Sequence, residues 1–122
     1  MVITHSAIEF PAVQLLGLAL DAASLRQQVI ANNIANAGIP DFQPLRVSFE
    51  ERLSALTASN RALAPDGLQK LRPTISSDSA ATPAIDQQMV QLSANVLHYR
   101  ALLKNLNAHF ELLSLASNDG RR

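Results

Sequence analysis

The sequence predicts a mainly α-helical protein in which two long terminal helices pair as an antiparallel coiled-coil hairpin. Three observations support this fold class. Apolar residues recur in steps of three and four near both ends, the stretch between them has linker composition, and 122 residues suit a single domain. We expect residues 1–37 and 83–122 to form one helical assembly domain, joined by a partly disordered middle segment at 38–82.

The first predicted helix runs from Pro11 to about Ala37. Its seam, apolar at seven of eight positions, comprises Val13, Leu16, Leu20, Ala23, Gln27, Ile30, Ile34 and Ala37. This heptad spacing indicates lengthwise packing against another helix. Pro11 suits a first turn, and Gly38 with Pro40 forms a helix stop in which Gly38 supplies a left-handed cap.

The middle segment holds four of the six prolines and a serine-rich run, which is typical of a linker. A short amphipathic piece from Val47 to Leu56 fits either a helix or a strand followed by a helix, and the sequence leaves both open.

The last predicted helix spans about Pro83 to Ser117. Its seam is apolar or aromatic throughout and comprises Ile85, Met89, Leu92, Val96, Tyr99, Leu103, Leu106, Phe110 and Leu113. Asp86 lies in the first turn, where a negative charge is favourable beside the helix dipole.

Each helix also carries a second apolar row: Leu15, Leu18, Ala22, Leu25 and Val29 on the first, and Val90, Ala94, Leu97, Ala101 and Ala108 on the last. A helix that is apolar on two sides needs neighbours on two sides. Charged residues make up only 16% of the chain, against a usual value of about 25%. We therefore expect other subunits to cover these rows. The alternative is a compact all-helical monomer whose middle segment folds back over them.

Asparagines near the end of the first helix have a physical interpretation of their own. Asn36 is expected to cap the helix, while Asn32 and Asn33 fix the register between packed helices, as Asn95 does on the last helix. The residues expected to carry helix packing and assembly are Leu16, Leu20, Ile30, Asn32, Asn33, Ile34, Asn36, Met89, Leu92, Asn95, Val96, Tyr99, Leu103, Leu106 and Phe110.

Composition argues against several function classes. Ten basic and ten acidic residues give no reason to expect nucleic acid as a partner. His98 and His109 lie about 16 Å apart along one helix, too far to share a metal ion. We find no catalytic apparatus, and we expect no cofactor and no small-molecule substrate. The N-terminus lacks the pattern of a cleavable signal, and no stretch is apolar enough for a membrane anchor.

One motif points to a family. The run Ala31-Asn32-Asn33-Ile34-Ala35-Asn36-Ala37 matches seven consecutive residues of the pattern of flagellar rod and hook axial proteins, in which Thr-Pro-Gly-Tyr follows. Here Ile39, Asp41 and Phe42 replace the threonine, glycine and tyrosine. The later segments resemble the proximal-rod type, through Val47-Ser48-Phe49-Glu50 and through Asp86, Met89, Leu92, Asn95, Tyr99, Leu103 and Phe110.

This resemblance implies a structural, non-enzymatic subunit that self-assembles in the proximal rod of the flagellar basal body. It further implies export through the flagellar secretion apparatus without a cleaved signal, and a place in a tube across the periplasm. The implied partners are copies of the chain, other rod proteins, the rod-base adaptor, the membrane-ring protein and the export gate. The alternative function is a soluble helical adaptor or secretion chaperone that binds a partner helix.

Overall fold

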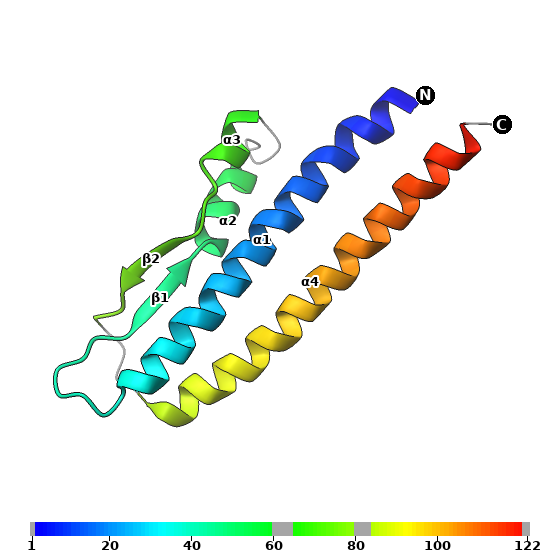
Figure 1. The fold of residues 1–122 in the computed structure, drawn as a ribbon. Helices are drawn as coiled ribbons and strands as arrows, with labels where there is room; N and C mark the ends of the chain where they lie inside the picture. Colours follow the sequence, from blue (N-terminus) through cyan, green and yellow to red (C-terminus); the bar gives the residue numbers. More distant parts are fainter. Residues whose placement is uncertain (1, 60–64, 80–83, 121–122) are drawn as a thin grey trace.

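The computed structural model describes residues 2–59, 65–79 and 84–120, and two long helices dominate it. The elements in chain order are α1 (Val2–Asn36), β1 (Leu45–Ser48), α2 (Glu50–Ala58), α3 (Pro65–Gln69), β2 (Thr74–Ser77) and α4 (Ile85–Asp119). Figure 1 shows α1 and α4 running antiparallel, with both chain ends at the same end of the hairpin. The predicted fold class, mainly helical with two paired terminal helices, is confirmed.

Helix α1 begins earlier than predicted. It starts at Val2 and contains Pro11 within its length, so the expected start at Pro11 was wrong. Proline inside a helix removes one backbone hydrogen bond, a loss that the rest of this 35-residue helix outweighs. All eight positions of the first predicted seam, seven in α1 and Ala37 just after it, are buried or half-buried, as a packed seam requires.

The helix stop has a different geometry from the one expected. Helix α1 ends at Asn36, ahead of Gly38, but no described glycine has a positive φ angle. The left-handed residue is instead Asp41, at φ 60°. The Phe42 amide donates to the Ile39 carbonyl at 3.3 Å, so Pro40 and Asp41 are the central residues of a turn with the type II pattern. The left-handed cap predicted at Gly38 was therefore wrong.

The middle segment folds against α1. Strands β1 and β2 pair antiparallel, with Leu45 opposite Ser77 and Ser48 opposite Thr74. Of the two possibilities for Val47–Leu56, the structure has the strand followed by a helix, β1 then α2. Helix α3 and strand β2 were not predicted from the sequence. Both are short, and they lie in a segment whose proline and serine content is typical of a linker.

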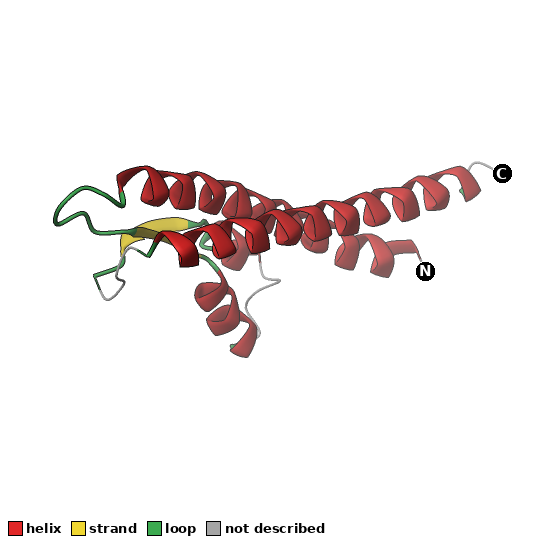
Figure 2. Cartoon of the chain, turned by 90° about the horizontal axis from the view of Figure 1, so that it is seen from below, coloured by secondary structure: helices red, strands yellow, loops and turns green. Residues whose placement is uncertain are grey.

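The core lies between this segment and one side of α1. Its fully covered members are Ala22 of α1, Phe49 beside β1 and Leu71 after α3, and five more side chains pack around them: Leu15, Leu18, Ala19, Leu53 and Leu56. The second apolar row of α1 is thus covered by the same chain, as in the monomer alternative. Figure 2 shows the segment attached along one side of the hairpin.

The second apolar row of α4 has no such cover. All five of its residues are exposed, with Val90 at 69% and Leu97 at 67%. The predicted boundary between residues 82 and 83, and the start of the helix at Pro83, lie outside the described residues. Among the described helices, none has a stretch apolar enough to cross a membrane.

Candidate assembly surface

The contact between α1 and α4 is aligned by side-chain amides. Asn95 of α4 is 5% exposed, and its Nδ2 donates to the Ala23 carbonyl at 2.8 Å and to Gln27 Oε1 at 3.0 Å. A buried amide is stable only where its polar groups are paired, so sliding α4 along α1 would break both bonds. The contacts of Asn95 are those expected of a register-setting residue.

Asn33 joins three elements. Its Nδ2 donates to the Leu45 carbonyl at 2.8 Å and to Gln88 Oε1 at 3.2 Å, and its Oδ1 accepts from the Leu45 amide at 2.9 Å. One side chain therefore bonds both backbone groups of Leu45 in β1 and the side chain of Gln88 in α4. Asn33 is 2% exposed, so these bonds are shielded from water.

Asn32 does not have the role expected of it within the hairpin. It is exposed, and its Oδ1 and backbone carbonyl accept hydrogen bonds from Asn36 Nδ2 at 3.1 and 2.8 Å. Asn32 lies on an exposed face of α1 and so does not set the register between α1 and α4, while its role in contacts with other subunits stays a prediction. Asn36 makes a helix-end contact of the kind expected of it.

Helix α4 presents a different face to α1 than predicted. The better-covered positions are an inner row at seven-residue spacing: Gln88, Asn95, Leu102 and His109, of which the first two are buried and the others half-buried. An outer row, one residue later, comprises Met89, Val96, Leu103 and Phe110. Leu92 and Leu106 lie between the rows and are half-buried.

The outer row was expected to pack within the hairpin, and for three members this was wrong. Met89 is 56% exposed, Leu103 40% and Phe110 50%. The interface is rotated about 50° from the predicted seam, half of the 100° between successive residues of a helix. The reason is that the amides of Gln88 and Asn95 find partners on α1, so these two polar residues take positions in the inner row.

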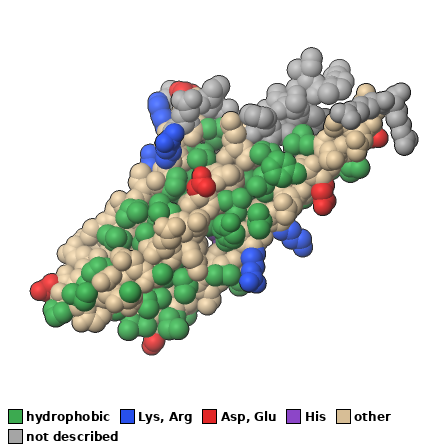
Figure 3. Space-filling view, viewed as in Figure 1, with side chains coloured by type: hydrophobic (Ala, Val, Ile, Leu, Met, Phe, Trp, Pro, Cys, Tyr) green, Lys and Arg blue, Asp and Glu red, His purple; other side chains and the backbone are tan. Residues whose placement is uncertain are grey.

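A groove lies where the outer row meets α1, and Figure 3 shows hydrophobic side chains gathered along the two long helices. It is lined by Ala23, Ser24 and Gln27 from α1 and by Asn95, Val96, Tyr99, Arg100 and Leu103 from α4. Most of the lining is carbon. A groove of this kind fits an apolar side chain of another helix rather than a polar metabolite.

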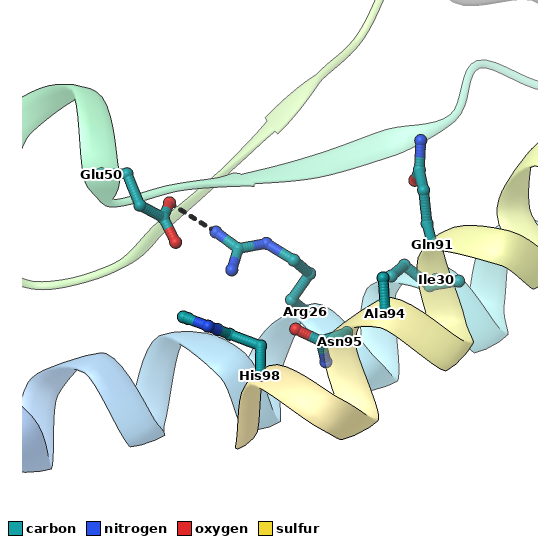
Figure 4. Close-up of a pocket in the computed structure, with 7 residues that line it drawn as sticks. All are labelled: Arg26, Ile30, Glu50, Gln91, Ala94, Asn95 and His98. Atoms are coloured by element: carbon teal, nitrogen blue, oxygen red, sulfur yellow. Dashed lines mark hydrogen bonds and ion pairs between the residues drawn. The ribbon is translucent and has the colours of Figure 1, made fainter. Parts of the chain in front are cut away.

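A second hollow lies on the side of the hairpin that faces the middle segment (Figure 4). It is lined by Arg26, Ile30, Glu50, Gln91, Ala94, Asn95 and His98. The Arg26 guanidinium bonds the Glu50 carboxylate at 2.7 Å and the Val47 carbonyl at 3.4 Å. The charge of Arg26 is thereby paired with that of Glu50 in α2, so this ion pair links α1 to the middle segment that covers it.

The carboxyl of Glu51 is perturbed by a local hydrogen bond. Glu51 accepts a hydrogen bond from the Ser48 hydroxyl at 2.8 Å, which lowers the pKa of that exposed carboxyl below its ordinary value. This bond stabilises the first turn of α2. Within the described residues, no three His, Asp or Glu side chains are grouped so that they could hold a metal ion.

The remaining expected assembly residues divide by helix. Leu16, Leu20, Ile30 and Ile34 are buried or half-buried in α1, whereas Tyr99 is 38% exposed at the groove. The sequence interpretation missed Gln88 as an interface residue. The signal that would have found it is the seven-residue spacing of Gln88 and Asn95, two amides in a row that counting apolar residues passes over.

Two curated proteins are similar to this chain. The flagellar basal body rod protein FlgB of Bacillus subtilis strain 168 is 28% identical over 127 aligned residues, which cover 89% of this chain and 95% of that protein. The flagellar basal body rod protein FlgB of Borrelia hermsii is 49% identical over 43 residues, covering 35% of this chain and 32% of that protein. No family model matches the chain. The resemblance to flagellar basal body rod proteins of the FlgB type is confirmed.

Proposed function

We propose that this chain is a structural subunit of the bacterial flagellar basal-body rod, of the FlgB type, and that it acts by helix–helix assembly rather than as an enzyme. The similarity to FlgB of Bacillus subtilis, which extends over 95% of that protein, supports the assignment. The two terminal segments, 1–37 and 83–122, serve as one assembly domain, with 38–82 attached to its side.

The observation that carries the proposal is the exposed apolar side of α4. Twelve large hydrophobic side chains among the described residues are at least 38% exposed, and ten of them belong to α4. Fully burying such a side chain stabilises a protein by about 1.5 to 3 kcal/mol, so covering even half of this surface supplies several kcal/mol. Single apolar residues on a surface are ordinary, but a contiguous side of a helix marks an interaction site.

Other rod proteins and copies of the chain are the partners that this role implies. More specifically, we place the chain in the proximal rod, in contact with the rod-base adaptor and the membrane-ring protein, after passage through the export gate. It then spans part of the periplasm and reaches it without a cleaved signal. Mass spectrometry of the protein from purified basal bodies tests the last point, since the N-terminal peptide should begin at the first or second residue.

The groove beside α4 also keeps a second candidate function open, that of a soluble adaptor or secretion chaperone that binds a partner helix. A chaperone stays in the cytoplasm as a stable dimer and is absent from the finished organelle. Stoichiometric recovery of the chain in washed basal bodies supports the rod subunit, and its absence there, with a soluble dimer in the cytoplasm, supports the chaperone.

The mutational test compares two aspartate substitutions on α4. Leu103→Asp puts a charge into the outer row, where assembly would have to bury it, whereas Asn105→Asp puts the same group on a neighbouring exposed position. In a strain whose own copy is deleted, we expect Leu103→Asp to abolish motility and Asn105→Asp to preserve it. Motility with Leu103→Asp would contradict assembly through this side of α4.

A further inference from the structure

We propose that the last turns of α4, Phe110–Asp119, dock into the groove between α1 and α4 of a second copy, so that copies join head to tail. This inference deepens the proposed function, and it rests on it. The occupant of the groove is a segment of the same chain, and three independent features of the described residues support that choice.

The first feature is that the end of α4 is an apolar segment without cover. Every residue from Glu111 to Gly120 is exposed, including Leu112 at 58%, Leu113 at 39% and Leu115 at 61%. Leu112 and Leu115 are three residues apart and therefore lie on one side of the helix. An apolar row at this spacing is what helix-in-groove recognition uses.

The second feature is the groove itself. Val96, Tyr99 and Leu103 form one apolar wall, and the opposite wall consists of the small or flexible residues Ala23, Ser24 and Gln27. Small residues on one side let a third helix approach closely, while the larger side chains of α4 supply contact area. The groove spans about two helical turns on α4, as does the leucine-bearing segment.

The third feature is charge. The segment Phe110–Asp119 carries Glu111 and Asp119 and no basic residue. Arg100 is one of the residues that line the groove, and Lys104 follows one turn later on the same helix; both are exposed. The two acidic groups of the segment and the two basic groups beside the groove attract each other. This attraction disfavours docking of the segment in the opposite direction.

Geometry excludes docking of the segment into the groove of its own chain. Asn95 bonds the Ala23 carbonyl, so the groove lies near that level of α4. Ser114 is roughly 28 Å farther along the same straight helix, so a chain cannot fill its own groove. The groove and the segment are different surfaces. A contact between different surfaces does not close on two copies and instead continues as a filament, which fits a rod.

Disulfide cross-linking tests this contact directly because the chain contains no cysteine. One full-length chain carries Ser24→Cys in the groove, and a second, with a different tag, carries Ser114→Cys, Ala116→Cys or Ser117→Cys. These three positions point to different sides of the helix end. A disulfide needs Cβ atoms about 3.5 to 4.5 Å apart, so only a docked segment can form one with Ser24→Cys.

We expect mild oxidation of the concentrated mixture to give a mixed dimer with at least one of the three segment variants. A chain with both substitutions should give a ladder of oligomers. The matched control is Ser54→Cys, an exposed serine on α2, which should cross-link with none of them. No mixed dimer above the level of this control overturns the proposal, as does a predominance of Ser24→Cys pairing with itself.

Two further variants test the chemistry of the contact. Leu115→Asp, at a position exposed in the monomer, should lower the cross-link yield about tenfold or more. Arg100→Glu and Glu111→Lys should each lower the cross-link yield when introduced alone. When both substitutions are present, the cross-link yield should return toward that of the parent. An unchanged yield with Leu115→Asp contradicts the proposal. If the chain is recovered in basal bodies while these cross-links fail, the rod function stands and the head-to-tail contact does not.

Discussion

The two long helices have the same length, 35 residues each, but different surroundings within the chain. Helix α1 is covered by α4 on one side and by the middle segment on another, and between Pro11 and Asn36 four of its apolar residues are buried. Helix α4 has no buried apolar residue, and its two buried positions are the amides Gln88 and Asn95. The monomer is therefore built around α1, while the apolar rows of α4 are left uncovered within the described chain.

The charges follow the same division. Between Pro11 and Asn36, α1 carries only Asp21 and Arg26, and the latter is paired with the middle segment. Helix α4 carries charges at five positions, Asp86, Arg100, Lys104, Glu111 and Asp119, and all are exposed. These charges keep α4 compatible with water before assembly, although its apolar rows are uncovered.

The sharpest test of this comparison replaces one phenylalanine that packs against α1 and one that is exposed on α4. Phe49 is 2% exposed in the core against α1, whereas Phe110 is 50% exposed on α4. We expect Phe49→Ala to lower the free energy of unfolding by about 3 to 5 kcal/mol. Phe110→Ala should change it by less than about 1 kcal/mol while impairing assembly. Urea unfolding of both variants measures the difference, and equal losses would break the comparison.

A second test compares neighbouring asparagines of α1. Asn33→Ala removes the buried side chain that bonds Leu45 and Gln88, leaving buried polar groups unpaired. The expected loss is about 2 to 3 kcal/mol. Asn32→Ala, at an exposed position, should cost no more than about 0.5 kcal/mol. Thermal unfolding of the pair decides whether α1 is anchored through Asn33, since similar melting temperatures would exclude it.

A third test concerns the turn that leads from α1 to its cover. Asp41 has a φ angle of 60°, which β-branched residues rarely adopt. Asp41→Val should destabilise the chain by about 1 to 2 kcal/mol. Asp41→Gly should stay within about 0.5 kcal/mol, because relief of the left-handed strain offsets the extra freedom of the unfolded chain. If valine is tolerated in thermal unfolding as well as glycine, the turn does not constrain the middle segment.

The smallest expected effect is a pH dependence of stability that arises from Glu51 in the middle segment. The pKa of Glu51 is lowered from 4.5, chiefly by the hydrogen bond from Ser48. A carboxyl whose pKa is lower in the folded state adds stability above its ordinary pKa, and this is lost as the pH falls through the lower folded value. Glu51→Gln should therefore be slightly less stable than the parent at pH 7, and this difference in stability should shrink as the pH falls through the lowered pKa of Glu51. A difference that does not shrink in acid would show another cause.

The sequence predicted the paired helices because apolar spacing over more than three heptads has few other solutions. It could not predict which of two adjacent apolar rows of α4 would face α1. Met89, Leu103 and Phe110 form a better seam than Gln88 and Asn95 by hydrophobicity alone. The more apolar row is left exposed in this chain, because the inner row is decided by hydrogen bonds of Gln88 and Asn95 that spacing does not show.

The turn and the middle segment were hidden for different reasons. Helix-capping preferences place the left-handed residue at Gly38, just after the helix. In the structure it is Asp41, the position at which the Thr-Pro-Gly-Tyr pattern has its glycine. Strand β2 is Thr-Ile-Ser-Ser with every residue exposed, a composition that reads as loop. It forms because β1, fixed to α1 through Leu45, supplies an edge on which to pair.

The junction of α1, α4 and β1 depends on amides, and this has a consequence for the conditions in which the molecule holds its shape. Amide side chains do not gain or lose protons in the range that proteins meet, and neutral dipoles are little affected by dissolved ions. Asn33, Asn95 and their glutamine partners should thus keep the two helices in the same alignment in acidic, alkaline or saline surroundings, where an alignment set by opposite charges would weaken.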